Sequence, residues 1–326
     1  MSDLRVGVIG TGHLGRIHTK LWSENTNADL IGIYDENPER RKLISEEFNC
    51  KQFDSVDELI HSCDALTIAV PTSLHHEVAM KCLNENKHCL IEKPITENYA
   101  QAKELIEAAK DKNLLIQVGH VERFNPVIAA IKKYDINPMF VEAHRLSQFQ
   151  PRAIDVSVIH DLMIHDIDIL LWLIKSPVTD IDANGVGVLT DNIDIANARI
   201  KFANGAVANI TASRISANPM RKMRIFQRNA YISLDFGKQN VEIFRLGDDA
   251  PEDAMTIPTT MLGQLEEALQ NKNIIYEKPQ VPELNAIAEE HTAFINAIKN
   301  NTPSAVGAYE ASEALKIAEE IQAIVK

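Results

Sequence analysis

The sequence lacks several features that mark particular classes of protein. Only four of its 326 residues are cysteines, and no two have the CxxC spacing, which argues against a disulfide framework or a zinc site. No apolar run approaches the roughly 20 residues that span a bilayer, and the first strand-like run begins too early for a signal peptide. With 33 basic against 46 acidic residues, the net charge of -13 disfavours binding to nucleic acid or anionic membranes. We therefore expect a soluble, cytoplasmic protein with neither as a partner.

What the sequence does contain is an alternation of strand-like and helix-like segments over residues 1–120. Short apolar runs such as 30–34 and 65–70 are each followed by a segment with helical character. This order is typical of an α/β domain with a doubly wound parallel sheet, the Rossmann type. Because 326 residues exceed the chain length that usually folds around a single hydrophobic core, we expect a second domain at 121–326.

Residues 121–326 follow another pattern, in which strand-like segments succeed one another with little helix between them. Asn204-Gly205 separates two such segments and is a strong signal for a β-hairpin turn. The pattern predicts an α+β domain with a large, mostly antiparallel open sheet. Its other expected elements are a strand at 139–146, helices at 283–299 and 309–325, and a polar loop at 247–264.

A glycine-rich turn follows the first predicted strand, 6–9. Gly10, Gly12 and Gly15 form a GxGxxG pattern around Thr11, His13 and Leu14, and a helix-like stretch follows at once. Such glycines permit a tight turn, close approach of a pyrophosphate, and close packing of helix on strand, while the helix N-terminus binds phosphate. A plain glycine turn would show the same letters. The strand before it and the helix after it favour a dinucleotide site.

The acidic residue that ends the next apolar run bears on the choice of dinucleotide. Asp35 lies twenty residues after Gly15. A carboxylate there can accept the ribose hydroxyls of NAD and would repel the 2′-phosphate of NADP. Arg40 and Arg41 lie nearby, but we expect them to face solvent from the next helix. The cofactor prediction is NAD, with NADP less favoured.

Polar residues also follow the strand predicted at 65–70. Ligands of open parallel sheets bind at the carboxyl ends of strands, where Pro71, Thr72 and His75 would lie. Thr72 or Ser73 could instead be a helix N-cap, and His75 could be an ordinary surface residue.

The next strand end carries Glu92-Lys93-Pro94. A lysine directly before proline lies on a stiff segment, so its ammonium group could polarise a substrate oxygen or hold the nicotinamide ribose. A salt bridge between Lys93 and Glu92 is the structural alternative.

A third group of polar residues lies within 155–168. At 3.6 residues per turn, Asp161, His165, Asp168 and Trp172 share one helix stripe opposite an apolar face. An imidazole beside a carboxylate is a natural general base, although a solvated polar face would show the same pattern. His160 is assigned to the apolar face, five residues from His165, so the spacing of a zinc-binding helix is absent and we expect no metal.

Basic residues cluster in the second half of this acidic sequence. Such a cluster could receive an anionic substrate, or it could pair with acidic residues across a subunit contact, and we favour the contact. Its members are Arg214, Arg221, Lys222, Arg224 and Arg228, with Arg145 and Arg152 upstream.

Taken together, these motifs resemble the Gfo/Idh/MocA family of sugar oxidoreductases over nearly the whole chain. The resemblance implies that Lys93, Asp161 and His165 are catalytic, with His165 as the base and Lys93 assisting. It further implies that Glu92 and Lys93, with Pro71, Thr72 and His75, border the cofactor, and that the C-terminal sheet builds a homodimer or homotetramer. The motifs concerned are the glycine turn at 10–15, Glu92-Lys93-Pro94, Gly119 with Glu122-Arg123-Phe124-Asn125-Pro126, and Asp161 with His165.

The resemblance implies an NAD-dependent dehydrogenase acting on a hydroxyl of a sugar, polyol or nucleotide sugar. The 155–168 segment is most similar to branches that act on nucleotide-linked amino sugars, including the 3-hydroxyl of UDP-N-acetylglucosamine. Two alternatives stay open: a dinucleotide-binding regulator without turnover, and an oxidoreductase that retains NADP and passes hydride between two sugars. One departure is the segment 227–230, where many relatives have glycine; this puts the local turn geometry in question.

Overall fold

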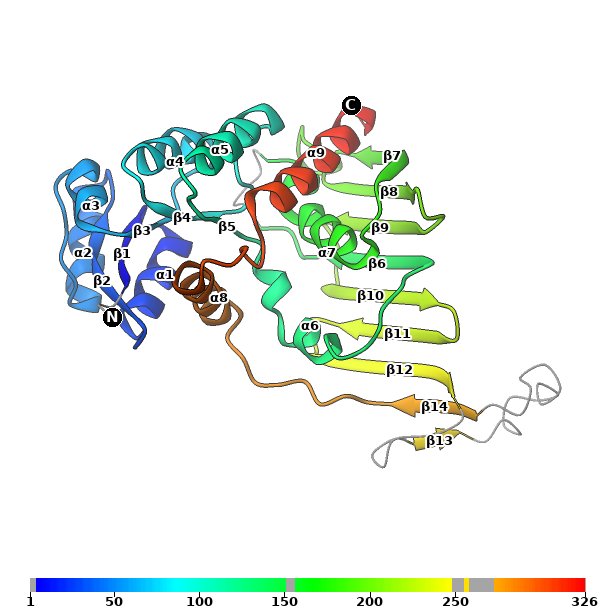
Figure 1. Cartoon of the computed structure of the whole chain (residues 1–326). Helices are drawn as coiled ribbons and strands as arrows, with labels where there is room; N and C mark the ends of the chain where they lie inside the picture. Colours follow the sequence, from blue (N-terminus) through cyan, green and yellow to red (C-terminus); the bar gives the residue numbers. More distant parts are fainter. Residues whose placement is uncertain (1–3, 151–155, 248–254, 258–272, 326) are drawn as a thin grey trace. The chain divides into compact units, whose positions relative to one another are not determined.

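The computed structural model describes residues 4–150, 156–247, 255–257 and 273–325 (Figure 1). The chain divides into two compact units, the first comprising residues 1–124 and 285–316 and the second 125–284 and 317–326. Residues 285–316, which the sequence analysis placed in a continuous second domain, thus group with the first unit. Asp155, Arg152 and most of the loop expected at 247–264 lie outside the described residues.

The first unit is built on a five-stranded parallel sheet with the order β2-β1-β3-β4-β5. The strand order reverses between β1 and β3, and crevices at such points bind ligands in doubly wound folds. The predicted Rossmann-type sheet is confirmed. Its strands are β1 (Leu4–Ile9), β2 (Ala28–Tyr34), β3 (Ala65–Ile68), β4 (His88–Glu92) and β5 (Ile116–Gly119).

Helices between the strands complete this unit, together with one helix and the first part of another from the C-terminal part of the chain. At the start of α2, Asn37 accepts a hydrogen bond from the Arg40 N–H and Pro38 occupies the first turn, which fixes where the helix begins. The helical elements are α1 (His13–Ser23), α2 (Pro38–Phe48), α3 (Val56–Ser62), η1 (Thr72–Leu74), α4 (His75–Asn84), α5 (Tyr99–Asp111), η2 (Val121–Phe124) and α8 (Ala286–Asn300).

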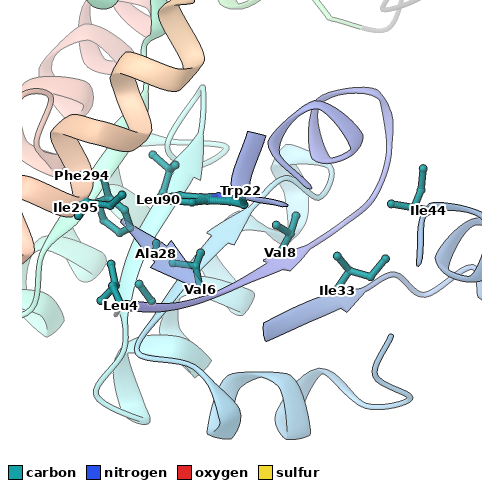
Figure 2. Close-up of a cluster of buried hydrophobic side chains, with 11 residues drawn as sticks. Leu4, Val6, Val8, Trp22, Ala28, Ile33, Ile44, Leu90, Phe294 and Ile295 are labelled. Carbon is teal, nitrogen blue, oxygen red and sulfur yellow. The ribbon is translucent and has the colours of Figure 1, made fainter. Parts of the chain in front are cut away.

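Helix α8, from the last part of the chain, contributes directly to the core of the first unit. Figure 2 shows Phe294 and Ile295 of α8 in the same buried cluster as Leu4, Trp22 and Leu90. Phe294 is completely buried, and burying a side chain of this size stabilises by about 1.5–3 kcal/mol. This packing explains why residues 285–316 group with the first unit.

The second unit is a nine-stranded mixed sheet with the order β13-β14-β12-β11-β10-β6-β9-β8-β7. The β6–β9 pair is parallel and the other neighbours are antiparallel, which confirms the mostly antiparallel sheet predicted for this part of the chain. The strands are β6 (Phe140–Leu146), β7 (Val178–Val186), β8 (Ile195–Phe202), β9 (Val207–Ser213), β10 (Met220–Gln227), β11 (Ala230–Asp235), β12 (Asn240–Gly247), β13 (Met255–Ile257) and β14 (Asn273–Glu277).

Two turns show how the sequence closes these hairpins. Gly205 has φ of +87° in the β8–β9 turn, which confirms the predicted hairpin. Asn229 has φ of +64° between β10 and β11, so asparagine takes the left-handed position that glycine would otherwise occupy. The expected loop at 247–264 is wrong in part, because Met255–Ile257 forms the edge strand β13.

One face of the large sheet carries fully buried apolar side chains, among them Val141, Ile225 and Ile243. Helix α7 (Ile164–Ile174) lies across the sheet (Figure 1). The unit also contains α6 (Pro126–Ile131), the π-helical turn η3 (Ile159–Met163) and the C-terminal end of α9 (Ala308–Val325). Among the described residues we find no helix with the length and apolar character needed to traverse a bilayer.

Candidate active site

The glycine turn between β1 and α1 has the geometry that its sequence predicts. Gly10 has φ of +88°, and its N–H donates to the carbonyl of Tyr34. Gly15 packs against the carbonyl of Gly10, where any side chain would collide. A Cβ atom on Gly12 would meet nothing within 4 Å, so this position borders open space. The turn thus leaves room for a ligand at Gly12, beside the amino end of α1.

Asp35, at the end of β2, is tied to this turn by hydrogen bonds. Its carboxylate accepts the Thr11 N–H at 2.7 Å, the Thr11 hydroxyl at 2.9 Å and the Asn37 N–H at 2.9 Å. Burial by itself raises the pKa of Asp35, but these hydrogen bonds and the nearby Arg40 guanidinium outweigh it and lower the pKa. The carboxylate therefore stays ionised at neutral pH.

The two arginines after Asp35 differ from each other. Arg40 is half exposed, with its guanidinium 3.5 Å from the Asp35 carboxylate. Arg41 was expected to face solvent, which is wrong: only 14% of its side chain is exposed, and it pairs with Asp54 and stacks over Tyr34. Arg40 is thus the cation beside the Asp35 carboxylate.

A cavity of about 880 Å³ lies at this edge of the sheet. A volume of this order suits a nucleotide-sized ligand. The space beside Gly12, the helix end and the carboxylate together fit a nicotinamide dinucleotide. Among the lining residues are Gly10, Gly12, His13, Leu14, Asp35, Arg40 and Pro71.

The residues after β3 follow neither of the two structural alternatives raised from the sequence, the helix N-cap and the surface histidine. The N-cap alternative is wrong, because η1 begins after Pro71 and α4 after Leu74, and neither helix has a side-chain cap. His75 is 1% exposed, so a surface position is also wrong. Its Nδ1 lies 2.8 Å from the Pro94 carbonyl and its Nε2 3.0 Å from the Val70 carbonyl. The contacts of His75 therefore connect the loop after β3 to the loop after β4.

Glu92 and Lys93 lie at the end of β4, before a cis peptide bond to Pro94. The Glu92 carboxylate lies 2.8 Å from Nε2 of His18 and accepts the backbone N–H of Lys93 at 3.2 Å. Burial by itself raises the pKa of Glu92, but His18, the Lys93 N–H and the positive charge of Lys93 outweigh it and lower the pKa. Glu92 is thus an anion that contacts the His18 imidazole and the Lys93 backbone.

In the second unit, Asp161 and His165 lie where a π-helical turn passes into α7. The Ile164 N–H donates to the Ile159 carbonyl five residues earlier, so the 3.6-residue spacing used in the sequence analysis does not hold here. His160, Asp161 and His165 are all partly exposed, so His160 is not claimed by the apolar face. Asp168 is 1% exposed, so this member of the predicted stripe does not face solvent, whereas Asp161, His165 and Trp172 are partly exposed.

Two buried arginines hold this helix and the segment before it. Arg145 of β6 forms a bidentate ion pair with Asp166 of α7, at 3.0 and 2.9 Å. Arg214 donates to Asp194 at 2.9 Å and to the carbonyl of Val156 at 2.7 Å. These contacts correct both interpretations of the basic cluster for Arg145 and Arg214, because their charges are satisfied within their own unit.

Asp194 also fastens the loop between β7 and β8. It accepts the N–H groups of Val188, Leu189 and Thr190 at 2.7 to 2.9 Å. Burial by itself raises the pKa of Asp194, but these hydrogen bonds outweigh it and lower the pKa. The remaining members of the cluster include Arg224, which pairs with Glu142, and Lys222, which pairs with Asp235.

Some residues around these sites were missed by sequence reasoning. His18 and its partner His291 are 273 positions apart, and no local pattern connects them. Thr11 lies inside the glycine turn, but its contact with Asp35 depends on how β1 and β2 pair. Within the described part of the chain, no group of three or more His, Cys, Asp or Glu side chains is arranged to hold a metal ion.

Comparison with known proteins places the chain among oxidoreductases. Residues 4–120 match a family described as "Oxidoreductase family, NAD-binding Rossmann fold", and residues 135–233 match the "GFO/IDH/MocA C-terminal domain". The sequence is 38% identical over 304 residues to UDP-N-acetylglucosamine 3-dehydrogenase of Acidithiobacillus ferrooxidans, covering 93% of this chain and 91% of that protein. It is also 28% identical to scyllo-inositol 2-dehydrogenase (NAD(+)) of Bacillus subtilis, over 66% of this chain and 68% of that one.

Solved structures agree with these matches. The UDP-N-acetylglucosamine 3-dehydrogenase from Acidithiobacillus ferrooxidans superposes with a TM-score of 0.88 at 35% identity, covering 100% of this chain and 98% of that chain. Levoglucosan dehydrogenase in complex with NADH shares the fold, with a TM-score of 0.82 at 18% identity over 99% and 97% of the two chains. These findings confirm the resemblance inferred from the motifs, and the chain belongs to the Gfo/Idh/MocA family of NAD-binding oxidoreductases.

Proposed function

We propose that this protein is an NAD-dependent dehydrogenase that oxidises the 3-hydroxyl of a UDP-N-acetylhexosamine. The observation that carries the proposal is 38% identity to a UDP-N-acetylglucosamine 3-dehydrogenase over 93% of this chain. The two proteins align over both units, so the similarity extends beyond the cofactor half that many dehydrogenases share. The first unit would bind the cofactor, and the second would bind the substrate and mediate oligomerisation.

We assign the proton chemistry to three side chains. His165 takes the proton of the substrate hydroxyl on its imidazole, because an imidazole has a pKa close to working pH. Lys93 donates a hydrogen bond to the same oxygen and stabilises its developing negative charge. Asp161 orients the substrate and the imidazole. The nicotinamide of NAD, when bound, supplies the acceptor for the hydride that leaves the same carbon.

We assign the cofactor as NAD on the state of Asp35. Its ionised carboxylate borders the cavity and would repel a 2′-phosphate. Gly10, Gly12, His13, Leu14 and Gly15 would hold the pyrophosphate against the amino end of α1. The nicotinamide end would be bordered by Pro71, Thr72, Glu92 and Lys93. His75 would hold together the two loops that carry these residues.

The test is formation of NADH by purified protein with a panel of UDP-sugars, free sugars and inositols. We expect turnover with a UDP-N-acetylhexosamine, and a 3-keto product by NMR. His165→Ala and Lys93→Ala should each lower kcat by at least about a hundredfold, the usual scale for a positioned acid–base group. His61→Ala is the matched control, because His61 is an exposed histidine paired with Glu85 on the surface. Wild-type rates in both active-site variants would refute the mechanism.

The same panel separates the two alternative functions. NAD binding without turnover on any substrate would indicate a regulatory member of the family. Protein purified with NADP retained, and turning over only when a second sugar accepts the hydride, would indicate a sugar–sugar oxidoreductase. The ionised carboxylate at Asp35 weighs against the second alternative.

We further propose that the outer face of the large sheet joins copies of this chain. A row of aromatic side chains crosses five neighbouring strands there, with successive ring centroids 4.8 to 5.9 Å apart. Phe226 in this row is 36% exposed, and contiguous aromatic surface of this kind is typical of interfaces. Phe226→Asp should dissociate a dimer or tetramer in sedimentation experiments, and an unchanged mass would refute the interface. The row consists of Phe140, Phe226, Tyr231, Phe244 and Tyr276.

A further inference from the structure

Four ionisable side chains lie buried together in the first unit, around the base of the loop that carries Lys93. They are His18 of α1, Glu92 of β4, and Glu290 and His291 of α8. His18, Glu290 and His291 are at most 1% exposed. Burying polar groups costs free energy, and apolar residues of similar volume are often at least as stabilising. A cluster of four ionisable side chains beside a proposed catalytic lysine therefore calls for a functional explanation.

The contacts form a chain that ends at the lysine loop. His291 Nε2 lies 2.7 Å from His18 Nδ1, and His18 Nε2 lies 2.8 Å from Glu92 Oε1. The other Glu92 oxygen accepts the Lys93 N–H at 3.2 Å. The His291 ring stacks on Trp22 at 3.7 Å, with 6° between the planes, so its orientation is fixed by packing.

The protonation states of His291 and Glu290 follow from their surroundings. Burial lowers the pKa of His291, so this imidazole is neutral. Burial, with repulsion from Glu92, raises the pKa of Glu290, whose carboxyl makes no hydrogen bond to any residue the structure describes. A carboxylate can only accept, so His18 Nε2–H donates to Glu92, and the same carboxylate accepts the Lys93 N–H.

We propose that His18 and His291 are positioning residues for Lys93, acting through Glu92. Together they fix the direction of the Glu92 carboxylate, and that carboxylate holds the Lys93 backbone in place. The inference rests on the proposed function, because it takes Lys93 to act on the substrate hydroxyl. It adds that a helix more than 190 residues further along the chain sets the geometry of this lysine.

Two substitutions of His18 separate this role from simple packing. A glutamine amide nitrogen reaches about the position of imidazole Nε2 and can still donate to Glu92, whereas an asparagine amide reaches only the position of Nδ1. His18→Asn should lower kcat by about a hundredfold, the scale of a misplacement near 1 Å, while KM for NAD changes less than twofold. His18→Gln should recover most of that loss. His88→Ala, which removes a partly buried histidine from the other end of β4, controls for loss of stability alone.

A measurement without turnover keeps this inference separate from the proposed function. In protein with isotope-labelled lysine side chains, Lys93→Arg identifies the Lys93 NMR signal. We expect His18→Asn to shift that signal and His18→Gln to return it toward the wild-type position. A wild-type protein without dehydrogenase activity would refute the proposed function and leave this test standing. Equal kcat values in the two His18 variants, or an unmoved Lys93 signal in both, would overturn the positioning role.

Discussion

Replacing Asp166 with alanine should destabilise the second unit by about 3–5 kcal/mol. Its carboxylate forms both hydrogen bonds of the bidentate pair with Arg145, and the side chains are 7% and 5% exposed. Without Asp166, the guanidinium remains buried and loses the anion that offsets its desolvation, and removing one partner of such a pair typically costs this much. The pair joins β6 to α7, so α7 should lose its anchorage next to His165.

The exposed pair of Lys201 with Asp180 on the same sheet gives the control. These side chains are 45% and 52% exposed, and surface pairs contribute about 0–1 kcal/mol. In a Trp22→Phe background, the other tryptophan, Trp172, lies in α7 and reports urea unfolding of this unit by fluorescence. A loss below about 1 kcal/mol for Asp166→Ala, no larger than for Asp180→Ala, would refute the reasoning. The double change of Asp166→Leu with Arg145→Met should recover most of the lost stability, because no unpaired charge is then left.

Three further predictions concern the first unit. Gly12→Ala should leave the melting temperature nearly unchanged, because its Cβ meets no atom, yet weaken NADH binding at least tenfold by calorimetry. Asp35→Ser should lower affinity for NAD by about 10–100-fold, the value of a charged hydrogen bond, and improve NADP binding beside Arg40; an unchanged ratio of the two affinities would contradict the assignment. Glu290→Gln should stabilise the protein increasingly as pH rises above about 4.5. Above that pH, the Glu290 carboxyl keeps its proton in the folded wild type but releases it in the unfolded chain, so the free energy of unfolding of the wild type falls as pH rises. Parallel stability curves for variant and wild type would contradict this, because they would show that Glu290 is ionised when folded.

Local patterns in the sequence were sufficient for the parts of the fold that depend on neighbouring residues. The glycine turn at 10–15, the alternation of strands and helices, and the Asn204-Gly205 hairpin each combine a backbone requirement with adjacent residues that meet it. The same holds for Asp35, whose distance from the glycines is set by one helix and one strand.

Other features could not be predicted because they depend on contacts distant in the sequence. The pairing of Arg145 with Asp166 depends on how α7 packs on β6, and the pairing of Arg214 with Asp194 depends on how β8 and β9 pair. The sequence alone therefore showed only a cluster of arginines of the kind found on a protein surface. The π-helical turn at 159–163 changes the helical period without a glycine or proline to signal it. Edge strand β13 is three residues long and polar in context, which the periodicity of a strand cannot reveal.

The late position of α8 in the chain has a consequence for biosynthesis. During translation, residues 4–119 can form all five strands of the parallel sheet well before residues 286–300 leave the ribosome. Until then Trp22 and Leu90 lack Phe294 as a neighbour, so the nascent domain presents an apolar surface to chaperones. A fragment that stops at residue 124 should therefore aggregate, whereas supplying 285–316 on the same polypeptide should keep it in solution.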